Sequence, residues 1–527
     1  MATTTLSPKT IEWALEHFQK HNDTDIFHKP FEFDAIYFGK DQFVKKLSSF
    51  DISQWKTRQY RRCLVPKQRY GFRLATQLDP VDTIFYFCLM LEAGEKIEKA
   101  RLSSDKKISF SYRFSPDDKD YLVFDKTIGY AEFQKYSGEL AKKHSFVVLT
   151  DVADFYPRIY HHRLENALNS ALKSLPNHAK AIQGLIRNWN QSVSYGIPVG
   201  NIPSRLLADL VIDDVDRLLL SEGITFTRFV DDYRIFCNSR QEAYKNLSKL
   251  ANALYDTQHG LTLQSQKTKI LSSDDFIRDI LETREKKEIE SLASKFREIL
   301  EDLGLDDPYE SFDIDDLSPE EKERIKGLNL ESLLDGQISK EDFDIPMTKF
   351  LINRLGQLKH TKTLGKLLKN IDNLHPVLAE IVRYVSEIGE GLKLNEREQV
   401  GTILLDKLQN SVLSNLEFNK MQIMSLFAGS NSWGNTDRLA KYYGFESGSF
   451  FRRTVILALG KAGHDWWLRT KKLEIDQMPP WDKRGFLYAA SCFPKDEKEH
   501  WFRTISKSRT DTLDTYIIDW ASKHPIT

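Results

Sequence analysis

Two apolar, β-branched segments that lie far apart in the chain each end in aspartate. Residues 144–152, HSFVVLTDV, predict a buried strand that ends at Asp151. Residues 224–238, ITFTRFVDDYRIFCN, predict a β-hairpin with Asp231 and Asp232 at its turn. Because Asp is a common turn residue, the pair by itself indicates only a turn. A sheet that pairs the two segments would bring all three carboxylates to one edge.

Three carboxylates at one edge of a sheet repel each other unless a cation lies between them. Several charged oxygen ligands suit Mg²⁺, which usually shares its coordination shell with substrate phosphates. Two such ions can stabilise the attacking and leaving oxygens of an in-line phosphoryl transfer. The sequence therefore predicts a two-ion Mg²⁺ site for nucleotidyl transfer, with Mn²⁺ as the alternative ion.

The elements around these segments indicate the fold class, which we expect to be α+β. Helices are expected at about 160–174, 178–191, 204–223 and 239–258, and a further strand pair or loop at 261–271. This order is typical of a split β-α-β sheet with helices on one face. From about residue 346 the patterns are helical, and two similar segments, FFRRTVILALGKAG and WDKRGFLYAASCF, predict stacked helix pairs. The tryptophans of this region are expected in its core.

The composition limits the classes of protein that fit. A chain of 527 residues, 41% hydrophobic and 29% charged, should be globular with about two to four domains. The net charge of -1 hides a basic stretch at 51–74 and an acidic stretch at 301–323. Four scattered cysteines without a CxxC pair indicate reduced thiols and no zinc site. Without a signal-like N-terminus or an apolar run of ~18 residues, we expect a cytoplasmic protein with no membrane partner.

Four segments resemble successive palm motifs of reverse transcriptases, in the order that this family has. They are TDVADFYPRI, GIPVGNIPSRLLADL, RFVDDYRIF and LTLQSQKTKIL, and the upstream CLVPKQRYGFRLATQLDP is similar to the fingers motifs. The resemblance covers about residues 50–275. The R-F-V-D-D core, the G-I-P-V-G-N-I-P-S-R loop and the long helical tail are similar to bacterial abortive-infection and "unknown group" reverse transcriptases, which are linked to phage defence.

The resemblance implies a right-hand polymerase core and a division of the chain. We expect N-terminal helices and fingers in 1–110, the palm in 111–285, an acidic helix or linker in 286–345, and an all-α, helical-repeat domain in 346–527. It further implies dNTP substrates, a DNA product and a nucleic-acid partner, such as a non-coding RNA template. Synthesis without a template, priming on a protein hydroxyl and a homo-oligomer also occur in the group.

The resemblance also assigns roles to single residues. Asp151, Asp231 and Asp232 would hold the metal ions, and Lys267 would protonate the departing pyrophosphate as a general acid. Tyr156 would be the steric gate whose ring excludes a ribose 2′-OH. The other residues expected at the substrate are Asp154, Phe155, Val199, Gly200 and the triphosphate-binding cations Lys67 and Arg73.

One position departs from the family pattern. Many members have Gln before the second glycine of the loop, where this chain has Val199. A valine side chain cannot donate a hydrogen bond near the incoming base pair, so we expect relaxed checking of the template. Arg228 and Arg234 flank the paired aspartates, and each fits either a contact with the primer or a structural ion pair.

Two other functions fit part of the pattern. A catalytically inactive reverse-transcriptase-like scaffold could bind nucleic acid, but such a protein is expected to lack one of the three aspartates. Another palm-fold nucleotidyl transferase or cyclase would share the sheet, because fold does not fix function. A cyclase needs neither the fingers segment nor the GIPVG loop.

Overall fold

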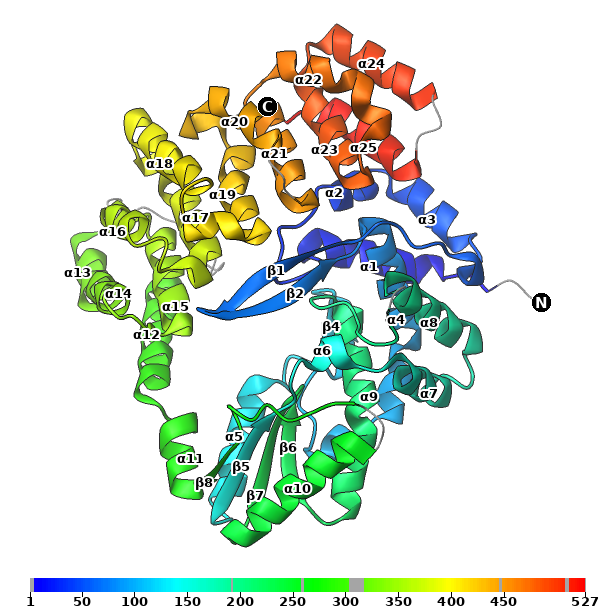
Figure 1. The fold of residues 1–527 in the computed structure, drawn as a ribbon, viewed down its shortest axis with the longest axis vertical. Coiled ribbons are helices and arrows are strands. Elements are labelled where there is room, and N and C mark those ends of the chain that lie inside the picture. Colours follow the sequence, from blue (N-terminus) through cyan, green and yellow to red (C-terminus); the bar gives the residue numbers. More distant parts are fainter. Residues whose placement is uncertain are drawn as a thin grey trace. The chain divides into compact units, whose positions relative to one another are not determined.

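The structure is a computed structural model that describes residues 4–190, 193–256, 260–302, 317–444, 448–507 and 511–526. The chain divides into two compact units, Met1–Arg62 with Ala75–Thr283, and Cys63–Leu74 with Arg284–Thr527 (Figure 1). Most described residues are helical, and the strands form small sheets. Residues 303–316, within the expected linker, lie outside the described residues. No helix in the described ranges is both long enough and apolar enough to cross a membrane.

The central sheet of the first unit has four antiparallel strands, which are β5 (Phe146–Asp151), β6 (Thr225–Phe229), β7 (Asp232–Cys237) and β8 (Lys269–Ser272). Their order is β6-β7-β5-β8, so the first strand lies between the hairpin and the last strand. The predicted strand and hairpin are confirmed. Their β-branched and aromatic residues pack well on a pleated surface that is buried on both sides.

Helices cover both faces of this sheet, so the expectation of helices on one face is wrong. Phe236 packs with Ala141 of α5 (Tyr130–Ala141). On the opposite face, Cys237 accepts a hydrogen bond from Asn246 of α10 (Arg240–Asp256) at 3.5 Å. Neighbouring residues of a strand point to opposite faces, and both of these strand residues are buried. The apolar run in β7 thus reflects two helix-covered faces.

The remaining helices of the first unit surround this sheet and extend from it. The helix α9 (Ile202–Ser221) packs against the buried α4 (Pro80–Ala100). Both helices carry proline in their first turn, where the missing N–H loses no intrahelical hydrogen bond. The others are α1 (Pro8–Lys20), α2 (Glu32–Phe38), α3 (Lys40–Ser48), α6 (Phe155–Arg158), α7 (His161–Ala171), α8 (Pro176–Trp189) and α11 (Ser273–Phe276).

Two further hairpins are present. Strands β3 (Phe114–Asp117) and β4 (Leu122–Phe124) pair in the first unit. Strands β1 (Arg61–Gln68) and β2 (Gly71–Gln77) form the other hairpin, whose tip groups with the second unit. There, the carbonyl of Arg69 is hydrogen-bonded to the His375 ring at 2.9 Å.

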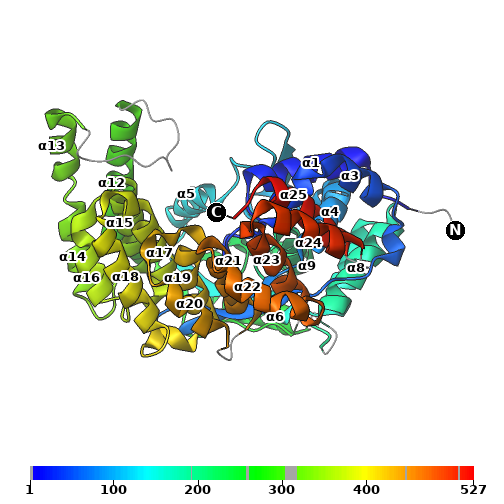
Figure 2. The same cartoon turned by 90° about the horizontal axis from the view of Figure 1, so that it is seen from above.

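The second unit is helical apart from the hairpin tip. Its helices are α12 (Arg284–Asp302), α13 (Pro319–Gly327), α14 (Leu330–Ile338), α15 (Ile345–Gln357), α16 (Leu364–Lys369), α17 (Leu378–Ile388), α18 (Leu394–Lys407), α19 (Glu417–Gly429), α20 (Thr436–Tyr443), α21 (Ser449–Lys461), α22 (Asp465–Lys471), α23 (Pro480–Ala489), α24 (Lys495–Lys507) and α25 (Thr512–Lys523). Alternate helices from α15 to α25 pack in succession, and Figure 2 shows them in a row.

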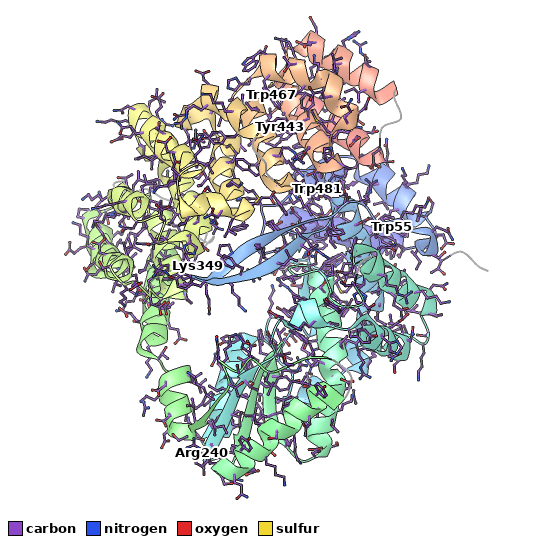
Figure 3. All side chains as sticks on the ribbon, viewed as in Figure 1. Trp55, Arg240, Lys349, Tyr443, Trp467 and Trp481 are labelled. Carbon is purple, nitrogen blue, oxygen red and sulfur yellow. The ribbon has the colours of Figure 1, made fainter. Side chains whose placement is uncertain are left out.

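The tryptophans of this unit are only partly in its core. Trp481 is fully buried, with the guanidinium of Arg484 4.5 Å from its ring centroid. Trp467 is buried against Tyr443, with ring centroids 4.8 Å apart (Figure 3). Trp466, however, is 55% exposed, so the expectation that the tail tryptophans are core residues is wrong for this one.

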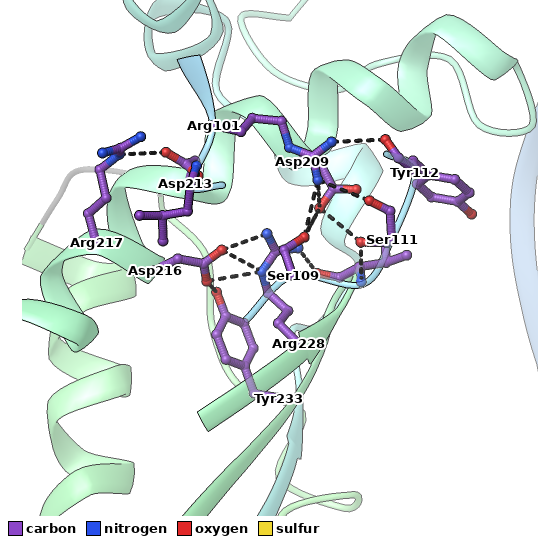
Figure 4. Close-up of polar contacts among 12 residues, drawn as sticks. Arg101, Ser109, Ser111, Tyr112, Asp209, Asp213, Asp216, Arg217, Arg228 and Tyr233 are labelled. Atoms are coloured by element: carbon purple, nitrogen blue, oxygen red, sulfur yellow. Dashed lines mark hydrogen bonds and ion pairs between the residues drawn. The ribbon is translucent and has the colours of Figure 1, made fainter. Parts of the chain in front are cut away.

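A buried network of charged side chains lies between α9 and the β6–β7 hairpin (Figure 4). The Arg228 guanidinium is fully buried and bonds Asp216 at 2.6–3.0 Å and Asp209 at 2.6 Å. Tyr233 donates its hydroxyl to Asp216 at 3.0 Å. Burial lowers the pKa of Arg228, but the two carboxylates outweigh this effect and raise the pKa well above its usual value. Arg228 is therefore a structural ion-pair residue rather than a primer contact.

Arg234 also has a structural role. Its side chain is buried, and its guanidinium lies 4.0 Å from the ring centroid of Phe133 on α5. The guanidinium also donates to Gln134 at 3.3 Å. This packing leaves the Arg234 charge facing α5.

Packing between α21 and α23 predicts a strong effect at one glycine. A Cβ atom at Gly460 would lie 2.7 Å from the Cα of Ala489, which is backbone and cannot rotate away. We expect Gly460→Ala to lower the free energy of unfolding by about 1–3 kcal/mol through overpacking. The matched control is Gly429→Ala, where a Cβ would meet nothing within 4 Å. Urea denaturation followed by circular dichroism measures both, and equal stabilities would contradict the packing.

The buried network predicts a pH-dependent loss of stability. Arg228→Met leaves the buried Asp216 without the guanidinium that bonds it, whereas Asp209 keeps Arg101 at 3.5 Å. The loss should cost about 3–5 kcal/mol at pH 8. Burial already raises the pKa of Asp216, and losing Arg228 would raise it further. The folded variant then binds more protons than the unfolded chain, so its stability deficit shrinks as the pH falls towards 5.

The control for this prediction is Arg217→Met. Arg217 bonds Asp213 at 2.7 Å, but its side chain is half exposed, so its loss should change stability by less than about 1 kcal/mol. Urea denaturation at pH 8 and pH 5 measures both variants. A deficit for Arg228→Met that matches the control, or that grows as the pH falls, would contradict the prediction.

Candidate active site

The three predicted aspartates meet at one end of the central sheet. Asp151, the last residue of β5, is the register partner of Asp232, the first residue of β7. The N–H of Val152 donates to the carbonyl of Asp231 at 2.9 Å, which ties the hairpin turn to the end of β5. The sequence-based prediction that these strands pair with their carboxylates at one edge is confirmed.

The turn that carries Asp231 is strained. Val230 and Asp231 connect β6 to β7, and Val230 has a φ of 58°, in the left-handed region. A β-branched residue adopts this region only where its surroundings enforce it. The N–H of Val230 donates to the Ser111 hydroxyl at 3.0 Å, and its carbonyl accepts from Arg228 at 2.8 Å. The buried network thus holds both polar groups of this residue.

Lys267 lies at the same edge. Its ammonium group donates to a carboxylate oxygen of Asp151, and the N–H of Gln264 donates to the carbonyl of Asp151 at 2.7 Å. Partial burial lowers the pKa of Lys267, but the bond to Asp151 and the charges of Asp231 and Asp232 raise it more. Lys267 is therefore a charged ammonium beside all three carboxylates.

The carboxylates are not gathered as a finished metal centre. Within the described ranges, no three His, Cys, Asp or Glu side chains are arranged to hold an ion. The charges of Asp231 and Asp232 both raise the pKa of Lys267. The charge of Asp232 also acts against the burial that lowers the pKa of Arg234, and the charge of Asp231 adds to the burial that raises that of Tyr156. The donor chemistry fits a hard divalent cation, since three carboxylate residues lie on neighbouring backbone segments at one end of the sheet. Their side chains would have to turn towards one another.

Tyr156 lies on α6, which follows β5. Asp154, two residues before Tyr156, has a φ of 48° and is the N-cap of this short helix. Tyr156 is half-buried, and its pKa lies well above the usual value because burial disfavours the phenolate and Tyr112, Asp209 and Asp231 add to this effect. The carbonyl of Tyr156 accepts the N–H of Ile197 at 3.1 Å. The backbone of Tyr156 is therefore tied to the glycine-rich loop, and its hydroxyl lies within reach of the charge of Asp231.

The two residues before Tyr156 point elsewhere. Asp154 is exposed and pairs with Arg158 at 3.5 Å. Phe155 is buried, with its ring centroid 5.6 Å from that of Tyr156. Their expected contacts with a substrate stay predictions.

The loop that contains Val199 has a conformation that requires glycine at two positions, and it is hydrogen-bonded to β2. Gly196 and Gly200 have φ values of 91° and 108°, which residues with a Cβ rarely adopt. A Cβ at Gly200 would lie 2.7 Å from the hydroxyl of Thr24. The carbonyl of Val199 accepts the N–H of Thr76 on β2 at 3.2 Å. Both glycines are thus required by backbone conformation, whatever approaches the loop.

Lys67 and Arg73 belong to the other unit. Both lie on the β1–β2 hairpin tip, and both side chains are exposed. Leu64, Tyr70 and Phe72 of the same tip are exposed as well. The tip therefore carries cations beside exposed apolar and aromatic side chains.

The sequence did not reveal the buried polar residues of the network that holds the turn before Asp231. Asp209 and Asp216 lie seven residues apart, on one face of α9, and both are buried. Acidic residues at helical spacing within the apolar segment LLADLVIDDVDRLLL were the available signal, because buried acids require partners. Ser111 gave no comparable signal, since a lone serine in a loop is common.

Comparisons with known proteins point to one domain family. Residues 95–296 match the family model described as reverse transcriptase (RNA-dependent DNA polymerase), which covers less than half of the chain but includes the three aspartates, Tyr156 and Lys267. None of the curated proteins matches the sequence.

Two solved structures show limited likeness. One is apo telomerase from Candida tropicalis, at 11% identity and a TM-score of 0.32, covering 68% of this chain and 68% of that chain. The other is telomerase from Candida albicans in complex with a TWJ fragment of telomeric RNA, at 13% identity and a TM-score of 0.32, covering 77% and 70%. Scores this low support no inference about this protein. The family match and the strand-end aspartates together identify a reverse transcriptase domain in this chain.

Proposed function

We propose that this protein is a reverse-transcriptase-like DNA polymerase that adds deoxynucleotides by two-metal nucleotidyl transfer. One observation carries the proposal: Asp151 and Asp232 are register partners beside the Asp231 turn, inside the segment that matches the reverse transcriptase model. Three carboxylates on rigid strand ends suit cations that neutralise a triphosphate and stabilise the transferring phosphoryl group.

The proposed metal ions are Mg²⁺, with Mn²⁺ as a substitute, held by Asp151, Asp231 and Asp232. When bound, they would supply charge stabilisation for the attacking and leaving oxygens. Lys267 now pairs with Asp151, so this ion pair must open before Asp151 can serve as a ligand. The released ammonium would then be free to give its proton to the departing pyrophosphate.

Selection of the sugar is assigned to Tyr156. Its side chain is half-buried, and its backbone is bonded to the loop that contains Val199, which supports this role. A ring held there would occupy the volume of a ribose 2′-OH. Asp154, Phe155 and Gly200 would shape the same substrate site.

The hairpin tip is proposed to bind nucleic acid and triphosphate. Its exposed Lys67 and Arg73 offer charge for phosphates, and its exposed Tyr70 and Phe72 offer surfaces for base stacking. Both features are typical of single-strand binding surfaces.

The biological role that fits best is antiphage defence by abortive infection. The sequence motifs support it, because the R-F-V-D-D core and the G-I-P-V-G-N-I-P-S-R loop are similar to those of the defence-associated group. Val199 in place of Gln supports synthesis with little or no template checking. The row of alternate helices from α15 to α25 supports a helical-repeat domain that binds a template or a second copy of the chain.

The central prediction concerns incorporation of deoxynucleotides. Purified protein with Mg²⁺ and each labelled dNTP, with and without co-purifying RNA, should form DNA that DNase digests. The Asp231→Asn, Asp232→Asn double variant and chelation of the metal should each reduce incorporation at least about a hundredfold. The matched control is Asp279→Asn, an exposed carboxylate paired with Arg278, which should retain activity.

The outcomes separate the candidate functions. Incorporation without RNA or added template would support template-free synthesis, and product that shifts only after protease treatment would show protein priming. Nucleic-acid binding without incorporation would favour the scaffold, and a cyclic nucleotide product would favour the cyclase. A double variant with undiminished incorporation would overturn the proposed site.

A second prediction tests sugar selection. Tyr156→Ala should raise the incorporation of ribonucleotides relative to deoxynucleotides by about tenfold or more, because the 2′-OH gains space. Tyr160→Ala is the matched control, since Tyr160 is 40% exposed and lies four residues further along the chain, beyond the end of α6. Competition assays with paired rNTP and dNTP measure the ratio. An unchanged ratio in Tyr156→Ala would refute the steric-gate role.

A further inference from the structure

The candidate catalytic turn depends on a conformation that its own residues disfavour. Val230 has a φ of 58°, and its side chain is buried. A valine there has a steric clash that glycine would not have. Something outside the turn must therefore hold the conformation in place.

Two hydrogen bonds provide this hold. Ser111 accepts from the N–H of Val230 at 3.0 Å, and Arg228 donates to its carbonyl at 2.8 Å. A single oxygen of Asp209 binds both partners, at 3.0 Å from the Ser111 hydroxyl and 2.6 Å from the Arg228 guanidinium. Figure 4 shows Asp209 with Ser111 and Arg228.

The hold acts directly on Asp231. This residue follows Val230, and its carbonyl accepts the N–H of Val152 at the end of β5. With the backbone fixed on both sides, the direction of the Cα–Cβ bond of Asp231 relative to Asp151 is set. A shift of the turn by a fraction of an ångström would change the distance between these carboxylates.

Stability alone gives a weak reason for such a network. Arg228, Asp209 and Asp216 are all almost completely buried, and well-packed apolar side chains often serve stability equally well. A network that binds both polar groups of one strained residue has geometric consequences that an apolar cluster could not provide.

We propose that Ser111 and Arg228 are positioning residues, which hold Val230 in its left-handed conformation and thereby aim Asp231 for metal binding. This inference rests on the proposed function of the aspartates. It adds that the buried polar network, rather than the turn itself, fixes the geometry of the site.

The test uses two serines that share a partner. Ser109 and Ser111 are both buried, and both bond the same Asp209 oxygen, at 3.4 Å and 3.0 Å. Only Ser111 also accepts from Val230. Ser111→Ala should lower kcat for incorporation about tenfold and raise the Mg²⁺ concentration for half-maximal activity, with the KM for dNTP nearly unchanged. Ser109→Ala, with a similar melting temperature, should keep both values close to those of the full-length unmodified protein.

Rescue separates positioning from a general structural role. Glycine accepts a φ of 58° without strain, so Val230→Gly in the Ser111→Ala background should restore at least about a third of the lost kcat. A merely structural role for Ser111 predicts no such rescue. Equal kcat and Mg²⁺ dependence in Ser111→Ala and Ser109→Ala would overturn the inference.

Failure of the inference is distinguishable from failure of the proposed function. If the unmodified protein incorporates no nucleotide under any condition, the proposed function fails, and the positioning role fails with it. If the unmodified protein is active and the Asp231→Asn, Asp232→Asn variant is not, the function stands. The two serine variants then decide the positioning role alone.

Discussion

The buried ion pair between Arg228 and the carboxylates of α9 is the interaction on which the edge with Asp151, Asp231 and Asp232 depends. Arg228 joins the hairpin of β6 and β7 to Asp209 and Asp216 with bonds of 2.6–3.0 Å. Taking three charges out of water is unfavourable unless they satisfy one another with good geometry. The pair therefore fixes the helix against the hairpin in one arrangement, and the strained turn at Val230 is held as part of it.

The paired strands and the strained turn hold the backbones of three aspartates close together although their negative charges repel each other. Asp151 and Asp232 start from fixed strand ends, while Asp231 projects from the turn. Without a divalent ion their charges are offset in part by Lys267, which bonds Asp151. Under the proposed function, bound metal ions would take over from Lys267 in balancing the charge of these carboxylates.

The second unit is stabilised by packing between helices that are close together in the sequence. Its alternate helices pack in succession, so each helix buries its apolar face mainly against near neighbours in the chain. Small residues such as Gly460 allow backbones to approach closely where a side chain would not fit. Such a row of helices can form an extended surface without a single large core.

The sequence by itself determined the strands, the hairpin and the edge where Asp151, Asp231 and Asp232 meet, because apolar periodicity and strand ends are local properties. It also indicated the reverse transcriptase domain through ordered motifs. Only the tertiary structure decided that helices cover both faces of the sheet, that Arg228 is a structural ion pair, and that Ser111 holds Val230. Ser111 lies 119 positions from Val230. Arg228 lies only 12 and 19 positions from its two carboxylates, but no local pattern encodes which buried charge will meet which partner.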